Sequence, residues 1–168
     1  NLFTFSEDYG NSVYIKEGST SPLAPIVTIN NSLSPRGLTE ASRIQFPSVS
    51  ATNSYSLVYR IIGSLSGNHN TFVYLKGNVG GESIFLFVIS GGVRTTLTCS
   101  LTTSWQKFEL PFTGTGSSFW QIGVDLRSNS GQSSRPAQTI YAWGTQLTLG
   151  ALSSSHIPTT SAAITRND

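Results

Sequence analysis

Short runs rich in β-branched and aromatic residues follow one another along most of the chain, and each run is bounded by Gly, Ser, Asn or Pro. This regular punctuation is typical of antiparallel β-structure. The longer runs lie at 54–62, 70–77, 82–90, 93–101, 105–112, 119–127 and 139–147, and shorter ones at 2–5, 25–30 and 42–46. No segment has a helical period, and Pro35 and Gly37 restrict the one candidate helical turn, at 34–42. The sequence therefore predicts an all-β protein, an antiparallel β-sandwich or jelly roll of about ten strands.

The chain of 168 residues has the length of a single domain with a core of its own. We therefore expect one domain over residues 1–168. Its last part, 148–168, is rich in Ser and Thr, and Pro158 prevents a helix there. Because this segment has too few apolar residues for a core of its own, we expect it to lie across the folded domain as a clasp and exit segment.

Composition excludes several classes of partner. Charged residues make up only 11% of the chain, the net charge is +2, and the ten basic residues are scattered. A nucleic-acid-binding domain needs clustered basic residues, so no nucleic-acid partner is expected. No apolar run approaches the length of a membrane span, so membrane insertion is not expected either. A surface of hydroxyls and amides suits an extracellular protein.

Polar and apolar residues alternate within several of the runs, so each of these runs has one polar and one apolar face. In 119–127 the residues Trp120, Ile122 and Val124 share one face, and in 54–62 the residues Tyr55, Leu57, Tyr59 and Ile61 form the apolar set. The run 82–90 is apolar on both faces, which predicts a strand in mid-sheet that is covered on both sides or lines an apolar groove. If the runs 54–62 and 119–127 are neighbours, their polar phases form a candidate glycan-binding face, with an ordinary solvated face as the alternative. The candidate residues are Ser56, Arg60, Phe119, Gln121, Asp125 and Arg127.

The chain offers little for catalysis or metal binding. Cys99 is the only cysteine, which excludes a thiolate metal cluster. The histidines, His69 and His156, lie in a polar turn and in the clasp, and no G-x-S-x-G motif is present. The run 139–147 lacks a carboxylate, although Glu7 and Asp8 could supply calcium ligands. We therefore expect no enzyme, no catalytic residues, no metal ligands and no cofactor, and leave a structural calcium ion as the less favoured alternative.

Six segments of the chain resemble, in the right order, motifs of a domain family common in structural proteins of tailed phages. The opening "NLFTFSEDYGN" resembles NLLxxSEDFxN, "SRIQF" resembles ADRIxF, and "FVYLKGNVGGESIFLFV" resembles FSVYLKG…GGETVxLxV. Further along, "TTSWQKFEL" resembles TTWQRFSV and "IGVDLR" resembles IGLDLR. The ending "YAWGTQLTLGALSSSHIPTTSAAITRND" resembles VWGAQLEEGSFATSYIPTTxAAVTRAAD, with departures at Thr145, Thr148, Leu149 and His156.

This resemblance implies a carbohydrate-binding-module-like jelly roll carried on a phage tail fibre, head fibre or decoration protein. It places the chain at the virion surface, outside the cell. The leading expectation is a module of a fibre or spike that binds a bacterial surface polysaccharide. The alternative is a structural decoration or cement domain that binds other virion proteins, with a homo-oligomer left open. The resemblance also implies that Ile157 fills an apolar site beneath the clasp and that Pro158 keeps the clasp extended.

Overall fold

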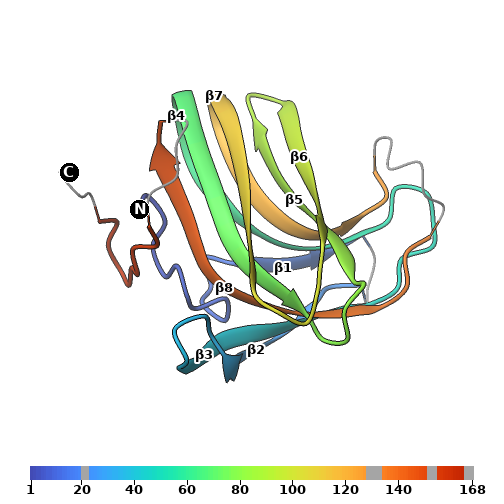
Figure 1. Ribbon diagram of the computed structural model, residues 1–168. Coiled ribbons are helices and arrows are strands. Elements are labelled where there is room, and N and C mark those ends of the chain that lie inside the picture. The colour runs from blue at the N-terminus through green and yellow to red at the C-terminus, as the bar shows by residue number, and fades with distance from the viewer. Residues whose placement is uncertain (20–22, 128–133, 151–154, 165–168) are drawn as a thin grey trace.

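Eight β-strands and no helix make up the regular structure in the computed structural model, which describes residues 1–19, 23–127, 134–150 and 155–164 (Figure 1). Within those ranges no helix has the length and apolar character needed to cross a membrane. The strands are β1 (Ile15–Gly18), β2 (Ile26–Leu33), β3 (Thr39–Phe46), β4 (Tyr55–Gly77), β5 (Ser83–Ser90), β6 (Val93–Ser100), β7 (Gln106–Asp125) and β8 (Gln138–Leu149).

Two very long strands, β4 and β7, connect the two layers of the fold. They pair antiparallel from Tyr55↔Asp125 to Leu75↔Gln106. The first half of β4 also pairs with β1, and the second half of β7 pairs with β5, which carries β6. We call these strands the β5 layer. The second half of β4 pairs with β8, which continues to β3 and β2, and we call this set the β8 layer.

The predicted all-β antiparallel architecture is confirmed, with eight strands where the sequence predicted ten. The runs 54–62 and 70–77 form the single strand β4, and the runs 105–112 and 119–127 form β7. The residues between them do not end the strands, because the ladder continues through Gly63 and Gly67 and their partners on β7. The run 2–5 is not a strand, whereas β1 was not predicted, and no helical turn forms in 34–42.

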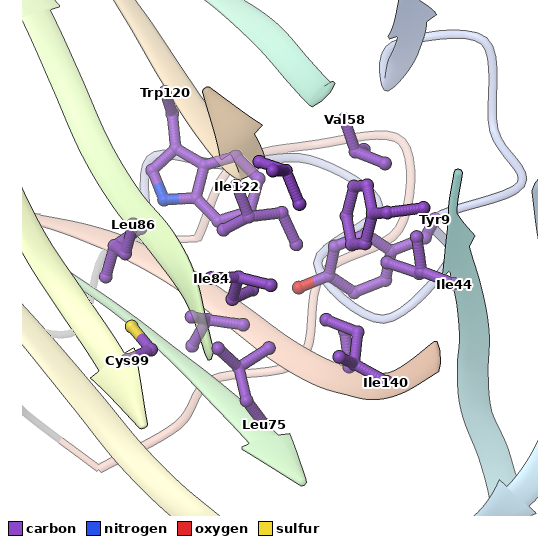
Figure 2. Packing of buried hydrophobic residues seen from close by; sticks show 14 of the residues in the cluster. Tyr9, Ile44, Val58, Leu75, Ile84, Leu86, Cys99, Trp120, Ile122 and Ile140 are labelled. Atoms are coloured by element: carbon purple, nitrogen blue, oxygen red, sulfur yellow. The ribbon is translucent and has the colours of Figure 1, made fainter. Parts of the chain in front are cut away.

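The core lies between the two layers (Figure 2). Trp120 and Ile122 of β7 pack with Ile84 and Leu86 of β5, and Ile140 of β8 closes the core from the other layer. All of these side chains are fully buried, as the alternation in 119–127 predicted for Trp120 and Ile122. Cys99 is buried in the same cluster, and burial raises the pKa of its thiol to about 12.

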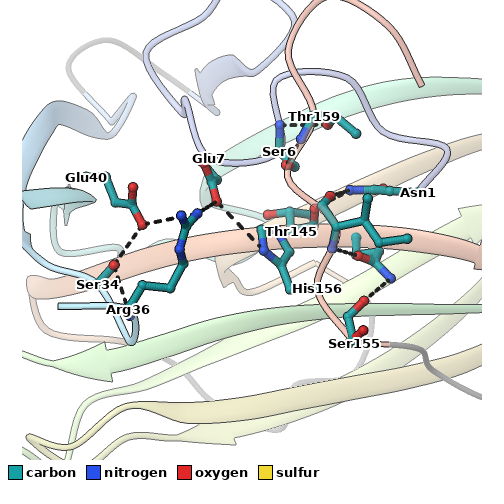
Figure 3. Close-up of polar contacts among 12 residues, drawn as sticks. Asn1, Ser6, Glu7, Ser34, Arg36, Glu40, Thr145, Ser155, His156 and Thr159 are labelled. Atoms are coloured by element: carbon teal, nitrogen blue, oxygen red, sulfur yellow. Dashed lines mark hydrogen bonds and ion pairs between the residues drawn. The ribbon is translucent and has the colours of Figure 1, made fainter. Parts of the chain in front are cut away.

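The two ends of the described chain lie side by side (Figure 3). The N-terminal segment, 1–6, bonds on one side to the end of β8, where the Leu2 N–H donates to the Leu147 carbonyl at 2.8 Å. On its other side it bonds to the C-terminal segment, 155–164, where the Phe5 N–H donates to the Thr160 carbonyl at 2.7 Å. The N-terminal segment thus bonds to both β8 and the C-terminal segment through its backbone.

The contact that holds the C-terminal segment is polar, which differs from the expected apolar plug. Ile157 is only partly buried, and its N–H donates to Oε1 of Gln146 at 2.7 Å. The buried residue is instead Thr159, whose hydroxyl donates to the carbonyl of Phe3 at 2.7 Å. The segment expected to form the clasp also includes the end of β8, and its residues 151–154 and 165–168 lie outside the described residues.

Candidate functional site

The outer face of the β5 layer carries a set of aromatic and arginine side chains. The ladder places residues of three neighbouring strands on this face, since Tyr59 pairs with Gln121 and Gln121 pairs with Phe87. Leu57, Phe85 and Phe87 form an apolar cluster there, separate from the main core. We define the arginine–aromatic face as Tyr55, Leu57, Tyr59, Phe85, Phe87, Arg94, Phe119, Gln121, Asp125, Arg127 and Arg135.

Four of the six predicted site residues belong to this face, and two do not. Phe119, Gln121 and Asp125 lie on it, and Arg127 folds back onto Asp125. The runs 54–62 and 119–127 lie on neighbouring strands, as the hypothesis required. The prediction that their polar residues share one face is wrong. Arg60 pairs with Trp120 and Ser56 pairs with Val124, so both point toward the core side.

The buried position of Arg60 has a clear structural role. Its Nη1 donates to the carbonyl of Thr4 at 2.8 Å, and its guanidinium lies 4.2 Å from the ring centre of Phe3 and 5.1 Å from that of Tyr14. Arg60 therefore fixes the N-terminal segment over the edge of the core. Ser56 is fully buried as well. Neither side chain can contact a ligand on the outer face.

One buried carboxylate holds two of the arginines on the face. Oδ1 of Asp125 accepts from the backbone N–H of Arg127 at 2.8 Å and from its Nε at 3.0 Å. Oδ2 accepts from Nη2 of Arg127 at 2.9 Å and forms an ion pair with Nη1 of Arg94 at 3.1 Å. A carboxylate has about four acceptor positions, so those of Asp125 are filled. Asp125 is 1% exposed, and in this structure its carboxylate positions the two arginines.

Each arginine of the face also lies against an aromatic ring. The guanidinium carbon is 3.9 Å from the ring centre of Phe87 for Arg94 and 3.8 Å from that of Tyr55 for Arg127. Arg135 lies 4.8 Å from the ring centre of Phe85. Stacking on a ring orients a guanidinium while its in-plane N–H groups remain free to donate. The rings thus hold the arginines in defined positions.

The ion pair between Arg94 and Asp125 shows that this face is concave. Arg94 is opposite Ile89 on β5, and Ile89 is opposite Phe119 on β7. In a flat sheet, Asp125 would lie six residues further along β7, roughly 20 Å from that row, and two strands away, roughly 10 Å. An arginine side chain cannot bridge such a separation. The β5 layer must therefore coil strongly, which brings the two ends of the face together.

Most of the aromatic residues of the face and two of its arginines are not predicted from the sequence. The signal for Phe85 and Phe87 was present, because the run 82–90 is apolar on both faces and was expected to line a groove or be covered. Tyr55 and Tyr59 belong to the apolar set of the run 54–62, and alternation alone does not show that this set faces outward. Arg94 and Arg135 are remote from the other residues in sequence, and no local pattern marks them.

The His, Cys, Asp and Glu residues do not assemble a metal centre in the described part of the chain. No group of three or more His, Cys, Asp or Glu could hold a metal ion there. His69 stacks on Phe112 with ring centres 5.6 Å apart. His156 packs on Trp143 at 4.5 Å, and burial is the main cause that lowers its pKa to about 4. Both histidines therefore have structural surroundings.

Several solved structures with a similar fold are carbohydrate-binding modules. A family 61 module in complex with β-1,4-galactotriose matches with a TM-score of 0.53 and 15% identity, over 82% of this chain and 88% of that one. The family 11 module from Clostridium thermocellum, in complex with a β-1,3-1,4-mixed-linked tetrasaccharide, matches with a TM-score of 0.54 and 12% identity, over 87% and 94%. The chain thus has the β-sandwich fold of these modules.

A similar domain also occurs within a larger phage protein. The enzymatically active domain of tailspike protein 4 of bacteriophage CBA120 matches with a TM-score of 0.56 and 10% identity, over 88% of this chain and 22% of that one. No protein-family model and no curated protein sequence matches the chain.

Proposed function

We propose that the chain is a non-enzymatic carbohydrate-binding module that holds a polysaccharide on the arginine–aromatic face. The observation that carries this proposal is the concave sheet face on which ring-stacked arginines lie beside partly exposed aromatic rings. Aromatic rings offer flat apolar surface to the C–H faces of sugar rings, and nearby donors bond their hydroxyls. The fold shared with carbohydrate-binding modules supports the same reading.

The face provides distinct groups for the two parts of a sugar. Tyr59 and Phe119 are partly exposed and can contact the apolar side of a sugar ring. Gln121 lies between Tyr59 and Phe87 and is 7% exposed, and its amide can both donate to and accept from a hydroxyl that reaches it. Arg94 and Arg127 keep N–H groups available beyond those bound to Asp125. Because the carboxylate and the rings fix both arginines, little ordering is needed on binding.

We further propose that the module acts at the virion surface of a tailed phage, outside the host cell. There it binds a bacterial surface polysaccharide as part of a fibre or spike. Two observations support this setting, the resemblance of six sequence segments to a phage family and the similar domain within a phage tailspike. Many copies on one virion would raise the avidity of a weak single site.

A structural role is the second candidate, and edge strand β2 favours it. Ile26, Ile29 and Leu33 of this strand are 65%, 48% and 57% exposed, and Leu38 in the following turn is 51% exposed. An edge strand with exposed apolar residues is suited to contact with another protein. A decoration or cement domain, or a homo-oligomer, would use this edge to bind virion proteins or a second copy.

A glycan array with matched variants tests the primary proposal. Tyr59→Ala removes a ring from the arginine–aromatic face, whereas Tyr141→Ala removes a partly exposed ring from the outer face of the β8 layer. We expect Tyr59→Ala to weaken binding to the polysaccharides that the wild type captures by about tenfold, which corresponds to about 1.4 kcal/mol. Tyr141→Ala should bind as the wild type does.

Equal binding by both variants would move the site away from this face. If the wild type captures no polysaccharide but binds a virion protein tightly, and Leu33→Asp abolishes that binding, the structural role replaces the proposed one. Circular dichroism of each variant establishes that a loss of binding is not a loss of fold.

A further inference from the structure

We infer that the ligand of the arginine–aromatic face is an acidic polysaccharide, one whose sugar units carry carboxylate groups. This inference rests on the proposed function and adds the chemical class of the glycan. It depends on three features of the face, namely its charge, its surplus of hydrogen-bond donors and one arginine without an anionic partner.

Positive charge is in excess on the face. The face carries three guanidinium groups, those of Arg94, Arg127 and Arg135, but one carboxylate, that of Asp125, which pairs with Arg94 and Arg127. The other acidic group nearby is Glu17, at the β1 edge, where its Oε1 accepts a hydrogen bond from the hydroxyl of Tyr55 at 2.6 Å. The described residues of the face and its edge therefore keep a net positive charge, although the whole chain is nearly neutral.

Arg135 is the arginine whose charge is least compensated. It is 7% exposed, its Nη1 donates to the carbonyl of Ser83 at 2.8 Å, and its Nε has no hydrogen-bond partner in the described part of the chain. Among the described residues it forms no ion pair, and burial lowers the pKa of its guanidinium. A buried charge without a partner is unfavourable, so an anion that reached it would gain more than at a hydrated surface.

Donors outnumber acceptors across the face. A guanidinium has five N–H donors and no acceptor. Arg94 directs Nε to the hydroxyl of Thr96 at 3.2 Å and Nη1 to Asp125, which leaves other N–H groups to donate. The acceptor positions of Asp125 are filled, so it cannot accept from a sugar hydroxyl.

This balance favours a carboxylate over a hydroxyl. A neutral sugar presents hydroxyls that both donate and accept, so its recognition needs protein acceptors as well as donors. A carboxylate only accepts, and it matches the planar fork of a guanidinium with two parallel hydrogen bonds. The concave shape of the face reduces exposure to solvent, which strengthens such a contact.

The test compares each polysaccharide with its own uncharged form. A panel of uronate-containing bacterial and plant polysaccharides is prepared as the native polymers and as polymers whose carboxyl groups have been reduced to alcohols, and neutral glucans and galactans are added. We expect at least about tenfold tighter binding to one or more native acidic polymers than to their reduced forms. That binding should weaken as NaCl rises from about 50 mM to about 500 mM.

Two arginine variants with a matched control locate the effect. Arg94→Gln and Arg135→Gln should each reduce the preference for the native over the reduced polymer by about tenfold or more. Because Arg94 is partly exposed, Arg94→Gln should fold, and it still tests the inference if Arg135→Gln does not fold. The control is Arg43→Gln, on β3 of the other layer, which should keep the wild-type preference.

The outcomes separate this inference from the proposed function. Equal binding to native and reduced polymers, or capture of neutral polysaccharides alone, would overturn the acidic ligand and leave a carbohydrate-binding module. Binding to no polysaccharide in the panel or on the array would overturn both. A preference for native polymers that Arg94→Gln and Arg135→Gln leave unchanged would place the acidic site elsewhere and overturn the inference for this face.

Discussion

The hydroxyl of Thr159 provides a direct test of how firmly the C-terminal segment is held against the domain. The side chain is 6% exposed, and its Oγ1 donates to the carbonyl of Phe3 at 2.7 Å. The same oxygen accepts from the Ser6 N–H at 3.3 Å. Valine has nearly the same shape without the hydroxyl, so Thr159→Val removes these two bonds and opens no cavity.

The two lost hydrogen bonds contribute differently to the free energy of unfolding. The Ser6 N–H also donates to the Thr159 carbonyl at 3.2 Å, and the valine variant keeps this bond. In the variant, the carbonyl of Phe3, a buried residue, loses the hydroxyl of Thr159 as its hydrogen-bond donor. Leaving a buried polar group unpaired costs about 1–3 kcal/mol, and we expect Thr159→Val to lower the free energy of unfolding by that amount.

Urea unfolding followed by tryptophan fluorescence measures this loss. Trp120 is a suitable reporter because its ring packs edge-on against Phe3, with ring centres 6.0 Å apart. The matched control is Thr160→Val, at the next position, which is exposed and should change the free energy of unfolding by less than about 0.5 kcal/mol. If Thr159→Val destabilised the domain no more than this control, the C-terminal segment would be a loose appendage, and our account of it would be refuted.

Two further predictions concern acid and calcium. Burial and the positive charge of Arg36 lower the pKa of His156 to about 4, and Oε1 of Glu7, at 3.7 Å from Nδ1, is too distant for a strong hydrogen bond. The unfolded chain binds a proton at this residue near pH 6.5, so the free energy of unfolding should fall as the pH drops from about 6.5 to about 4. Urea unfolding at both ends of this range should show a smaller fall for His156→Gln, and an equal fall would contradict a buried neutral imidazole. Thermal melts with calcium and with a chelator should coincide, whereas a calcium-dependent rise in Tm of about 10 °C or more would reveal a site that our reasoning missed.

The sequence predicted the fold class because alternation reports one buried face per strand. The burial of Trp120, Ile122 and Val124 followed directly from this pattern. The ends of the strands were harder to predict, because glycines such as Gly63 and Gly67 are typical of turns. In the structure they lie in a continuous ladder where β4 passes from one layer to the other. A local pattern does not distinguish a strand that ends from a strand that bends.

The candidate site was only partly predictable, because some apolar residues of its strands face the core and others face the outer surface. Tyr55 and Leu57 look like core residues, but they face outward and form part of the aromatic surface. Arg60 looks like a surface residue, but the N-terminal segment covers it. Whether an apolar phase faces the core or a ligand depends on which layer lies behind it, and that is decided by tertiary packing.

The shared β4–β7 ribbon determines how the domain would carry a mechanical load. The first half of β4 supports the arginine–aromatic face, and its second half is bonded to β8, to which the N-terminal segment attaches. A pull on a bound chain would therefore travel along the backbone of one continuous strand and reach the other layer without crossing the side-chain packing between them. The hydrogen bonds between β4 and β8 would be loaded in parallel, as in shear, and would have to yield together. If the domain binds a polysaccharide as proposed, this ribbon suits it to hold that polysaccharide under tension.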